Sequence, residues 1–414
     1  MNFGRVEAQV NVYLNQYPEL KKLVKRCYQK CIYVFSKKEK SSGKIIRLSP
    51  DNKKEYFFGY YDKTPWDRIG KHVLCMCADD TSKKAESDKP AEILLIDSTC
   101  QTAKTIAETS AWNVQQGCML QWLGPTFEEE IIFNDFRNGQ FCGVILNVKN
   151  GNERIISRPV YAVSLDGTTA LTLDFSRLHR LRYGYGYPNL EDSTKNEKLP
   201  DKTCIWKINL LTGEVEALLN YTDFANFEPK ESMKGAEHKI NHIMISPNGR
   251  RFMVLHRWFQ KGKKYTRLVT CRIDGKDLYN LSDDDMVSHC CWKNNDEILA
   301  FANKKKSGAG YYLMKDHTQE YKHLWKNLYS DGHPSYSPDE KMAITDTYPN
   351  RKRMSSLILL NKNNTKIIAK VFSPFKYDND TRCDLHPRWD RLGKKVCFDA
   401  TFEGHRGLYY VEVE

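Results

Sequence analysis

The chain has 414 residues, 40% of them hydrophobic, and its 64 Lys and Arg outnumber its 52 Asp and Glu, which gives a formal net charge of +12. This apolar content excludes intrinsic disorder as the main state, and no apolar run approaches the roughly 18 residues that cross a bilayer. The positive charge favours an acidic partner, such as a polyanionic glycan, a nucleic acid or an anionic membrane surface.

The first residues lack the apolar segment and cleavage site of a secretory signal, so we expect no export signal. Residues 8–40 show apolar side chains at helical spacings, and Pro18 is expected to divide this helix in two. We predict an amphipathic helical extension over residues 1–42. It either packs on the main domain or places its basic part, residues 20–38, on an anionic membrane surface.

Thirteen cysteines in a chain of this size do not indicate a disulfide framework, because the number is odd. Seven lie in strand-like apolar runs, where a free Cys behaves as a small buried hydrophobe: Cys75, Cys77, Cys142, Cys271, Cys290, Cys291 and Cys397. We therefore expect reduced thiols and a cytoplasmic protein, either free or peripheral on the inner face of the membrane.

Seven segments after residue 42 share one pattern, in which a short apolar strand, a Trp or Ser, a polar turn and a second apolar strand follow one another. Their Trp or Ser anchors are Trp66, Trp122, Ser164, Ser246, Trp292, Ser337 and Trp389. Successive anchors lie 42 to 56 residues apart, except for the 82 residues between Ser164 and Ser246. A four-stranded propeller blade has this length, so the pattern predicts an all-β fold, a seven-bladed β-propeller over residues 43–414.

The long interval contains LHRLRYGYGYPNLEDSTKNEKLPDK, which we interpret as an insertion between two strands of one blade. The last blade ends at GLYYVEVE and needs another strand to close the ring. We expect the N-terminal GKIIRLS to supply it, because an open edge would leave backbone groups unpaired.

Four consecutive units carry a His three or four residues before the anchor: His242, His289, His333 and His386. Equivalent positions of successive blades face the central channel, so these side chains should converge at one entrance. Three or four neutral imidazoles suit a divalent metal, and they also suit proton transfer. His238 is a candidate fifth member of the rim.

Several cationic and phenolic side chains stand at strand ends near these histidines. Arg257, Arg388 and Tyr185 are the strongest catalytic candidates, together with His333 and His386. Weaker candidates, for substrate binding, are Arg137, Arg158, Tyr183, Tyr348 and His238.

These segments carry a family resemblance. INHIMISPNGRRFMVLHRW, VSHCCWKNNDEILAF, DGHPSYSPDEKMAITDTYP and RCDLHPRWDRLGKKVCFDATFEGHRGLYYVEV, with the upstream GYYDKTPWD and QQGCMLQWL, resemble the TolB-like propellers that include oligogalacturonate lyase and, more distantly, the ulvan lyases. The resemblance covers residues 56–414.

The resemblance implies a seven-bladed propeller whose channel histidines, here His242, His289, His333 and His386, hold a divalent metal, manganese or zinc. It further implies that this metal, with arginines, neutralises a uronate carboxylate during β-elimination. We therefore expect a carbon–oxygen lyase acting on an acidic oligo- or polysaccharide. In oligogalacturonate lyases two of the ligands form a His-x-His pair near a Gln, and this sequence lacks that triplet.

Two alternatives stay open. The propeller could be a non-catalytic glycan-binding module or scaffold beside a membrane-side polysaccharide assembly, because a propeller fold alone does not decide activity. A glycoside hydrolase fits less well, since the channel entrance is dominated by His rather than by paired carboxylates. The sequence shows no nucleic-acid-binding signature, no phosphate-binding loop for a nucleotide cofactor and no G-x-S-x-G motif.

Overall fold

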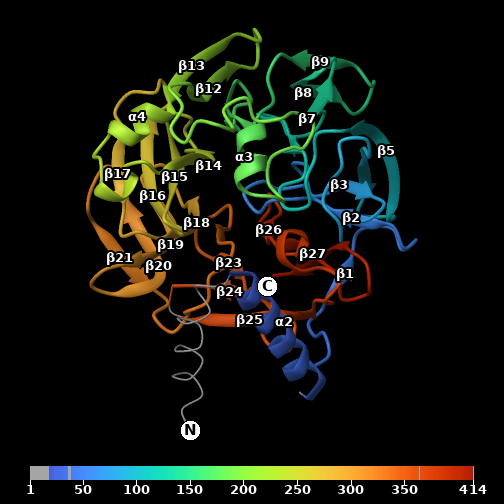
Figure 1. Cartoon of the computed structure of the whole chain (residues 1–414). Coiled ribbons are helices and arrows are strands. Elements are labelled where there is room, and N and C mark those ends of the chain that lie inside the picture. The colour runs from blue at the N-terminus through green and yellow to red at the C-terminus, as the bar shows by residue number, and fades with distance from the viewer. Residues whose placement is uncertain (1–17, 36–38, 363, 414) are drawn as a thin grey trace.

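The computed structural model describes residues 18–35, 39–362 and 364–413. Seven four-stranded antiparallel sheets stand around a central axis (Figure 1), which confirms the predicted seven-bladed β-propeller. The first blade consists of β2 (Glu55–Phe57), β3 (His72–Ala78), β4 (Ala91–Asp97) and β5 (Thr102–Thr109). The second blade consists of β6 (Gln121–Trp122), β7 (Glu130–Arg137), β8 (Gln140–Asn147) and β9 (Glu153–Ile156). The third blade consists of β10 (Ala162–Val163), β11 (Thr169–Leu173), β12 (Thr203–Asn209) and β13 (Val215–Asn220).

The next three blades continue in the same order. The fourth blade consists of β14 (Glu237–Ile245), β15 (Arg251–Gln260), β16 (Lys263–Arg272) and β17 (Tyr279–Ser282). The fifth blade consists of β18 (Val287–Trp292), β19 (Glu297–Lys304), β20 (Gly308–Lys315) and β21 (Tyr321–Leu324). The sixth blade consists of β22 (Ser335–Tyr336), β23 (Ala343–Asp346), β24 (Met354–Leu360) and β25 (Thr365–Phe372).

The seventh blade joins the two ends of the propeller. It contains β26 (Arg388–Trp389), β27 (Lys395–Ala400), β28 (Gly407–Glu412) and, as its outermost strand, β1 (Ile46–Arg47). Ile46 pairs with Tyr410 and Arg47 with Tyr409. The N-terminal strand therefore closes the ring, as predicted.

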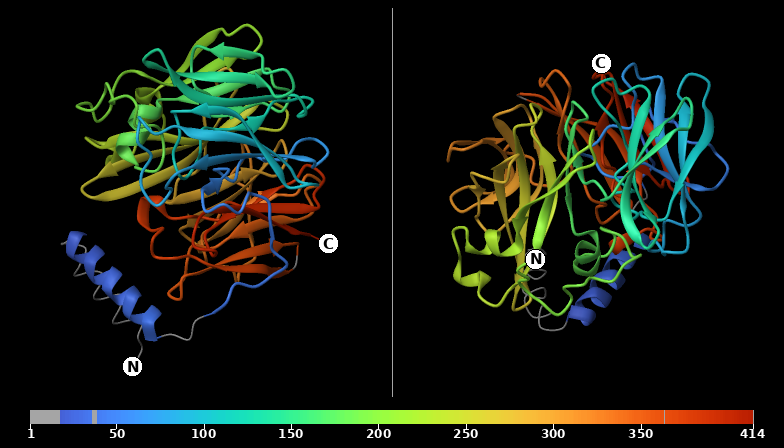
Figure 2. Two further views of the ribbon diagram at one scale, coloured as in Figure 1. Left: turned by 90° about the vertical axis from the view of Figure 1, so that its right-hand side faces the viewer. Right: turned by 90° about the horizontal axis from the view of Figure 1, so that it is seen from above.

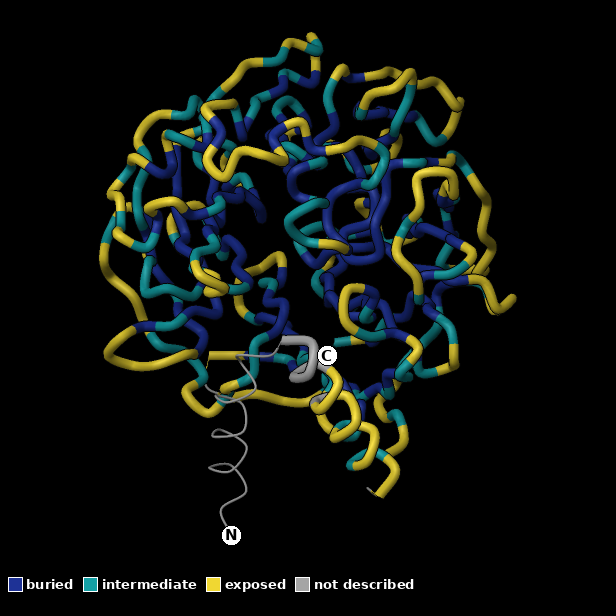
Figure 3. Tube along the Cα trace, viewed as in Figure 1, coloured by how far each residue is buried: buried dark blue, intermediate teal, exposed yellow. Residues whose placement is uncertain are grey.

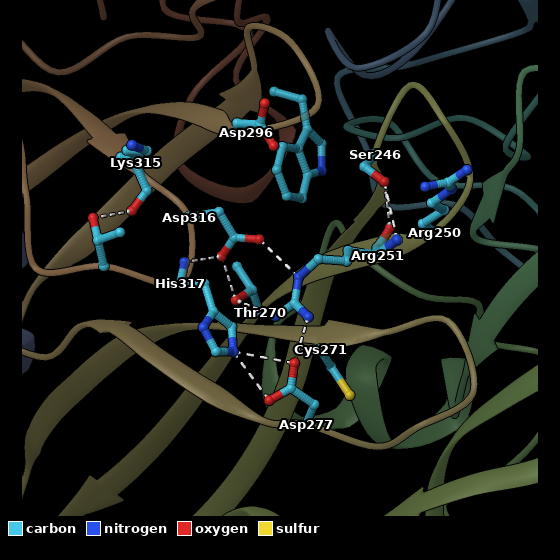
Figure 4. A network of polar contacts seen from close by, with 12 residues as sticks. Ser246, Arg250, Arg251, Thr270, Cys271, Asp277, Asp296, Lys315, Asp316 and His317 are labelled. Carbon is cyan, nitrogen blue, oxygen red and sulfur yellow. Dashed lines mark hydrogen bonds and ion pairs between the residues drawn. The ribbon is translucent and has the colours of Figure 1, made fainter.

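The Ser anchors close the turn between the first two strands of a blade. Ser246 Oγ donates to the carbonyl of Arg251 and accepts from its amide, both at 3.0 Å. The Arg251 side chain binds Asp316 of the next blade at 2.8 Å and Asp277 of its own blade at 2.7 Å (Figure 4). This network fastens two neighbouring blades at one face of the disc.

The hydrophobic core lies within and between the sheets rather than in a single centre. Its largest clusters combine strands of adjacent blades, such as Val144 with Phe57 and Phe252 with Ile208. Figure 3 shows buried chain along the inner strands and exposed chain mostly at the peripheral turns. All thirteen cysteines are free, and the seven expected to be buried are buried.

Helix α2 (Pro18–Phe35) lies against one face of the disc (Figure 2). The Tyr33 ring packs on Phe372 and Phe375 at centroid distances of 5.8 and 5.2 Å. Pro18 begins this helix, a position that suits proline because its missing amide is unpaired there anyway. The predicted first helical piece falls outside the described residues. Among the described helices, none has the length and apolarity to span a membrane.

The predicted insertion runs between β11 and β12. It begins with helix α3 (Phe175–Leu181), capped by the Asp174 carboxylate, which accepts from the Arg177 amide. The buried Arg177 side chain holds the rest of the insertion by donating to the carbonyls of Thr194, Glu197 and Lys198. Figure 1 places α3 beside the central opening. The remaining short helices are α4 (Tyr221–Asn226), η1 (Glu231–Met233) and η2 (Asn379–Thr381).

Candidate functional site

Four histidines from consecutive blades meet around the buried Tyr61 side chain at the centre of the propeller, where none is more than 5% exposed, and we call this cluster the histidine mouth. His242 lies in β14 and His289 in β18, while His333 and His386 each lie two residues before an inner strand. The centroid distances from the Tyr61 ring are 5.7, 5.9, 5.2 and 6.3 Å to His242, His289, His333 and His386. The predicted convergence of the four side chains is therefore observed.

Irregular backbone turns these side chains into the channel. Asn241 pairs with Leu255 but Met244 with Met253, so β14 carries one extra residue at His242. The strand β18 shows the same irregularity between Val287 and Cys290, around His289. Such bulges re-aim side chains near functional sites. His242 and His386 also adopt left-handed backbone with φ of 60° and 46°, which is strained for a residue other than glycine.

Two of the histidines form a metal-like donor set with a carboxylate. Nitrogen atoms of His333 and His386 and an oxygen atom of Asp384 lie within 4.8 Å of one another, and all three residues are buried. In the described chain, neither His333 Nε2 nor His386 Nε2 has a hydrogen-bond partner. His333 Nδ1 donates to Asp346 at 2.8 Å, the carboxylate support that metal-binding histidines usually have. The residues therefore fit a divalent cation.

The pKa values of the three donor residues are set by burial and by neighbouring charges. Burial lowers the pKa of His386 well below its usual value, and the neighbouring His333 lowers it further. Burial acts in the same direction on His333, but the Asp346 carboxylate outweighs it and raises the His333 pKa. Burial alone would raise the Asp384 pKa, whereas the ion pair with Arg382 lowers it. Asp384 is thus held as a carboxylate.

His242 is predicted to bind a metal, but its ring nitrogen has other partners. Its Nε2 lies 3.0 Å from the Cys290 carbonyl and 3.1 Å from the Tyr61 hydroxyl, so this nitrogen is not open to a metal. His289 is closer to the donor set, with its ring 4.2 Å from that of His333 and its Nδ1 3.1 Å from Asp331. The ligand set therefore changes: Asp384 joins His333 and His386, and His242 falls outside it.

A group of cations that includes Lys239, Arg257, Arg182 and Lys264 adjoins the histidines. Lys239 on β14 stands directly opposite Arg257 on β15, and the two residues are only 2% and 4% exposed. Burial lowers the pKa of Lys239 well below its usual value, and the charges of Arg257, Arg182 and Lys264 lower it further. Like charges placed opposite each other destabilise a sheet.

Among the described residues, neither Lys239 nor Arg257 forms an ion pair with a carboxylate, and Glu237, whose charge acts on Lys239, is paired with Arg180. Within the described ranges, Arg257 Nε and Nη1 have no hydrogen-bond partner, and Nη2 makes one long contact of 3.4 Å to the Ser288 carbonyl. Ser288 Oγ in turn donates to Asp331, the carboxylate that supports His289. The cationic pair thus adjoins the histidines, and its unpaired donors are suited to an anionic ligand.

Comparison with solved structures shows which known propellers this chain is similar to. The oligogalacturonate lyase of Vibrio parahaemolyticus matches with a TM-score of 0.64 at 14% identity, covering 92% of this chain and 99% of that one. An oligogalacturonate lyase in complex with manganese matches with a TM-score of 0.66 at 15% identity, covering 91% and 98%. The chain shares the oligogalacturonate lyase fold. No family model matches it, and the comparison with curated proteins found no match.

The same propeller fold also occurs in other enzymes. A prolyl endopeptidase matches with a TM-score of 0.51 at 11% identity, covering 88% of this chain and 49% of that one. Fold likeness to oligogalacturonate lyase therefore does not decide the chemistry, which has to be argued from the residues at the histidine mouth.

Two predicted tyrosines are brought to this mouth. The Tyr185 ring, from the insertion, lies 6.1 Å from Tyr60, and its hydroxyl accepts from Arg182 at 3.3 Å. Tyr348 lies 5.7 Å from His333 and is covered by Arg382, whose guanidinium carbon is 4.2 Å from the ring centroid. Both are therefore placed to contact a ligand of the histidine mouth.

Three predicted residues have structural partners instead. His238 is fully buried, with Nδ1 2.9 Å from His256 Nε2, and does not join the rim. Arg388 forms a buried ion pair with Asp399 and donates to the carbonyls of Gly59 and Tyr60. Arg137 pairs with Asp135 and with Glu153 of the outer strand. The prediction that these three side chains serve a ligand of the histidine mouth is therefore wrong.

The other two predicted residues that do not join the histidine mouth, Arg158 and Tyr183, lie farther from it. Arg158 stacks on Trp206 at 4.3 Å and lines a separate cavity of about 1000 Å³ with Asp174 and Tyr221. Tyr183 is half exposed, and the Lys84 ammonium lies over its ring at 3.7 Å. Both positions are in or near the insertion, whose fold the sequence pattern does not define.

Sequence reasoning missed Tyr60, Tyr61, Lys239, Arg182 and Asp384 as site residues. Two signals were available. The GYYDKTPWD segment supplies both tyrosines, and Asp384 stands two residues before His386, a spacing that places two possible ligands close together. Lys239 and Arg182 gave no such signal, because cations are frequent in this chain.

Proposed function

We propose that this protein is a lyase-like propeller that cleaves a uronate-containing, acidic glycan by β-elimination at the histidine mouth. The observation that carries the proposal is the buried Lys239–Arg257 pair, which forms no ion pair within the described residues, has unpartnered Arg257 donors and adjoins a cluster of histidines and carboxylates. A uronate carboxylate supplies the missing charge. Removing the proton next to that carboxylate builds up negative charge, which preorganised cations stabilise.

The proposed roles follow from the contacts. Arg257 binds the carboxylate as a cation, and Lys239, whose pKa is lowered in the free protein, gains its proton as the carboxylate binds beside it. His289 accepts the C5 proton, since burial lowers its pKa despite the Asp331 carboxylate that holds its Nδ1. The electron pair of the C5–H bond forms the C4–C5 double bond, the C4–O bond breaks, and the Tyr185 hydroxyl protonates the leaving oxygen.

The protein fits a divalent metal at His333, His386 and Asp384, and manganese and zinc both accept this donor set. When bound, such an ion supplies Lewis-acid neutralisation of the carboxylate and its enolate-like product. His333 and His386 keep their predicted importance in this arrangement, as the residues that would hold the ion.

A glycan-binding module without catalysis is the second candidate. The same unpaired Arg257 donors favour it, because an anion site serves binding as well as turnover. The two candidates differ in one observable: a lyase forms an unsaturated uronate that absorbs ultraviolet light, whereas a binding module retains the acidic glycan unchanged.

The Arg257→Gln variant tests the proposal. We expect wild-type protein supplied with Mn²⁺ or Zn²⁺ to release unsaturated product from at least one polyuronate. R257Q should lower kcat/KM by about 100-fold or more, because a charged donor at the developing negative charge is lost. The matched control is R250Q, an exposed arginine near the start of the same strand, which should keep full activity.

Two outcomes decide against the lyase. Full activity of R257Q would remove the cationic pair from the mechanism. Absence of product from all polyuronates, with binding that R257Q abolishes, would establish the binding module instead.

We also propose a reducing, cytoplasmic location. It is supported by the thirteen free cysteines, ten of which are buried and so protected from pairing.

A further inference from the structure

The outward face of helix α2 is apolar and exposed. Leu23, Val34 and Phe35 are 61%, 68% and 88% exposed, and Val24, Cys27 and Cys31 are exposed between them. We call these six residues the apolar stripe. Their spacings of one, three and four residues place them on one side of the helix. Tyr33, which packs on Phe372 and Phe375, is on the opposite side. The stripe therefore faces away from the propeller.

Helix α2 lies on the same face of the disc as the histidine mouth. Phe372 and Phe375 belong to the chain that leads from β25 to His386, and Arg351, which lies over Tyr28 at 5.8 Å, follows Tyr348 in the connection between β23 and β24. Both views of Figure 2 show α2 and α3 on one face. A surface that binds the stripe therefore also faces the mouth.

The charge of the helix indicates what that surface is. The α2 sequence PELKKLVKRCYQKCIYVF contains five Lys or Arg and a single Glu, and the whole chain carries a net charge of +12. A second copy of this chain would place two basic helices together, which electrostatic repulsion opposes. An anionic bilayer accepts both features, since acyl chains take up the apolar side chains and lipid head groups attract the net positive charge of the helix.

We infer that α2 anchors this protein peripherally on an anionic lipid bilayer and turns the histidine mouth toward the lipid surface. The inference concerns attachment and does not depend on the proposed elimination. Within the proposed function, it makes a glycan held at the membrane surface the substrate within reach of the mouth.

Vesicle flotation of the full chain tests the anchor. We expect binding to phosphatidylglycerol vesicles, at least tenfold weaker binding to phosphatidylcholine vesicles, and weakening of the former by salt. The double variant V34D/F35D should lose binding at least tenfold. The matched control is L211D, since Leu211 is 70% exposed but lies in the turn between β12 and β13. All three proteins should have equal melting temperatures, because the substituted side chains are on the surface.

The orientation is tested by hydrogen exchange of the vesicle-bound protein. We expect protection of α2 and of the connection 325–334, which reaches the mouth through Asp331, and no protection of the turn 210–214. Protection of 210–214 instead would overturn the orientation. Equal vesicle binding by V34D/F35D would overturn the anchor. A concentration-dependent dimer that V34D/F35D abolishes, without vesicle binding by the wild type, would assign the stripe to a second copy.

Discussion

His238 and His256 form a buried proton-sharing pair behind the histidine mouth. Arg267 Nε donates to His256 Nδ1 at 3.1 Å, which requires His256 to carry its proton on Nε2. That proton is donated to His238 Nδ1 at 2.9 Å, and His238 Nε2 faces the Met233 carbonyl at 3.4 Å. Both rings are 0% exposed and must be neutral for this chain of donors to hold.

This pair predicts a loss of stability in mild acid. Burial lowers the pKa of His238 to about 4, whereas the unfolded side chain titrates near about 6.5. Between these values the unfolded state binds the proton and the folded state does not, so stability falls as pH decreases from about 6.5 to about 4. The full effect of His238 is about 3 kcal/mol. Urea unfolding at several pH values gives the free energy of unfolding as a function of pH. The slope of this free energy against pH, between about pH 4 and about pH 6.5, should be smaller for H238N than for the wild type.

The control for this measurement is N150A, because Asn150 is exposed and its side chain does not titrate. It should keep the slope of the wild type. An H238N slope equal to that of the wild type would mean that the pair does not resist protonation.

The different surroundings of His238 and His242 show how far the sequence predicts the site. The register of four histidines on the repeat is a property of the inner strands, so their convergence followed from the sequence. A spacing of four along a regular strand also predicts that His238 and His242 share a side. The bulge after Asn241 breaks that alternation, and hydrophobic patterning does not reveal a single extra residue.

At the scale of strands, three of the four Trp anchors fasten their blade to the preceding one. Trp122 Nε1 donates to the Pro65 carbonyl at 2.8 Å, Trp292 Nε1 to Met244 at 3.1 Å, and Trp389 Nε1 to Ser335 at 3.2 Å. In each case the acceptor lies in the blade before. Trp66 occupies the same place in the first blade, but its buried Nε1 has no partner among the residues that the structure describes.

This contrast predicts different costs for the same substitution. W122F removes a hydrogen bond, while the Pro65 carbonyl still accepts from the Leu74 amide at 2.9 Å, so we expect a loss of about 1 kcal/mol beyond that caused by the smaller ring. W66F loses the same ring volume without a hydrogen bond, so it is the matched control. The two unfolding free energies are compared in urea, and equal losses would show that the indole hydrogen bond contributes nothing to blade contact.

The repeat predicted these elements because each blade needs the same few features, an inner strand, a tight turn and a fastening residue, at a nearly constant interval. The insertion after β11 has no such constraint. Its fold depends on Arg177 reaching three backbone carbonyls, a set of contacts that depends on the tertiary fold rather than on local pattern. Arg182 and Tyr185 therefore reach the site through contacts invisible to strand periodicity.

At the scale of the whole molecule, two ends of the chain share one sheet. The strand β1 covers the outer edge of β28, Leu48 beside it is only 3% exposed, and Arg47 forms an ion pair with Glu403. Among its described side chains, helix α2 contacts the propeller through Tyr33, which packs on Phe372 and Phe375, and through Tyr28, which lies under Arg351. The N-terminal region thus contains a segment that completes the fold and a segment attached to its surface.

Two truncations separate these segments. Removing residues 1–38 takes away α2 and should leave the melting temperature of the propeller nearly unchanged, because β1 remains paired. Removing residues 1–48 deletes β1, unpairs the edge of β28 and exposes the core beneath Leu48, so we expect a loss of several kcal/mol at about 1 kcal/mol per lost hydrogen bond. Calorimetry gives both melting temperatures, and light scattering should detect association through the open edge in the shorter protein alone. Equal melting temperatures for the two truncations would mean that six blades and an incomplete seventh hold the ring without the N-terminal strand.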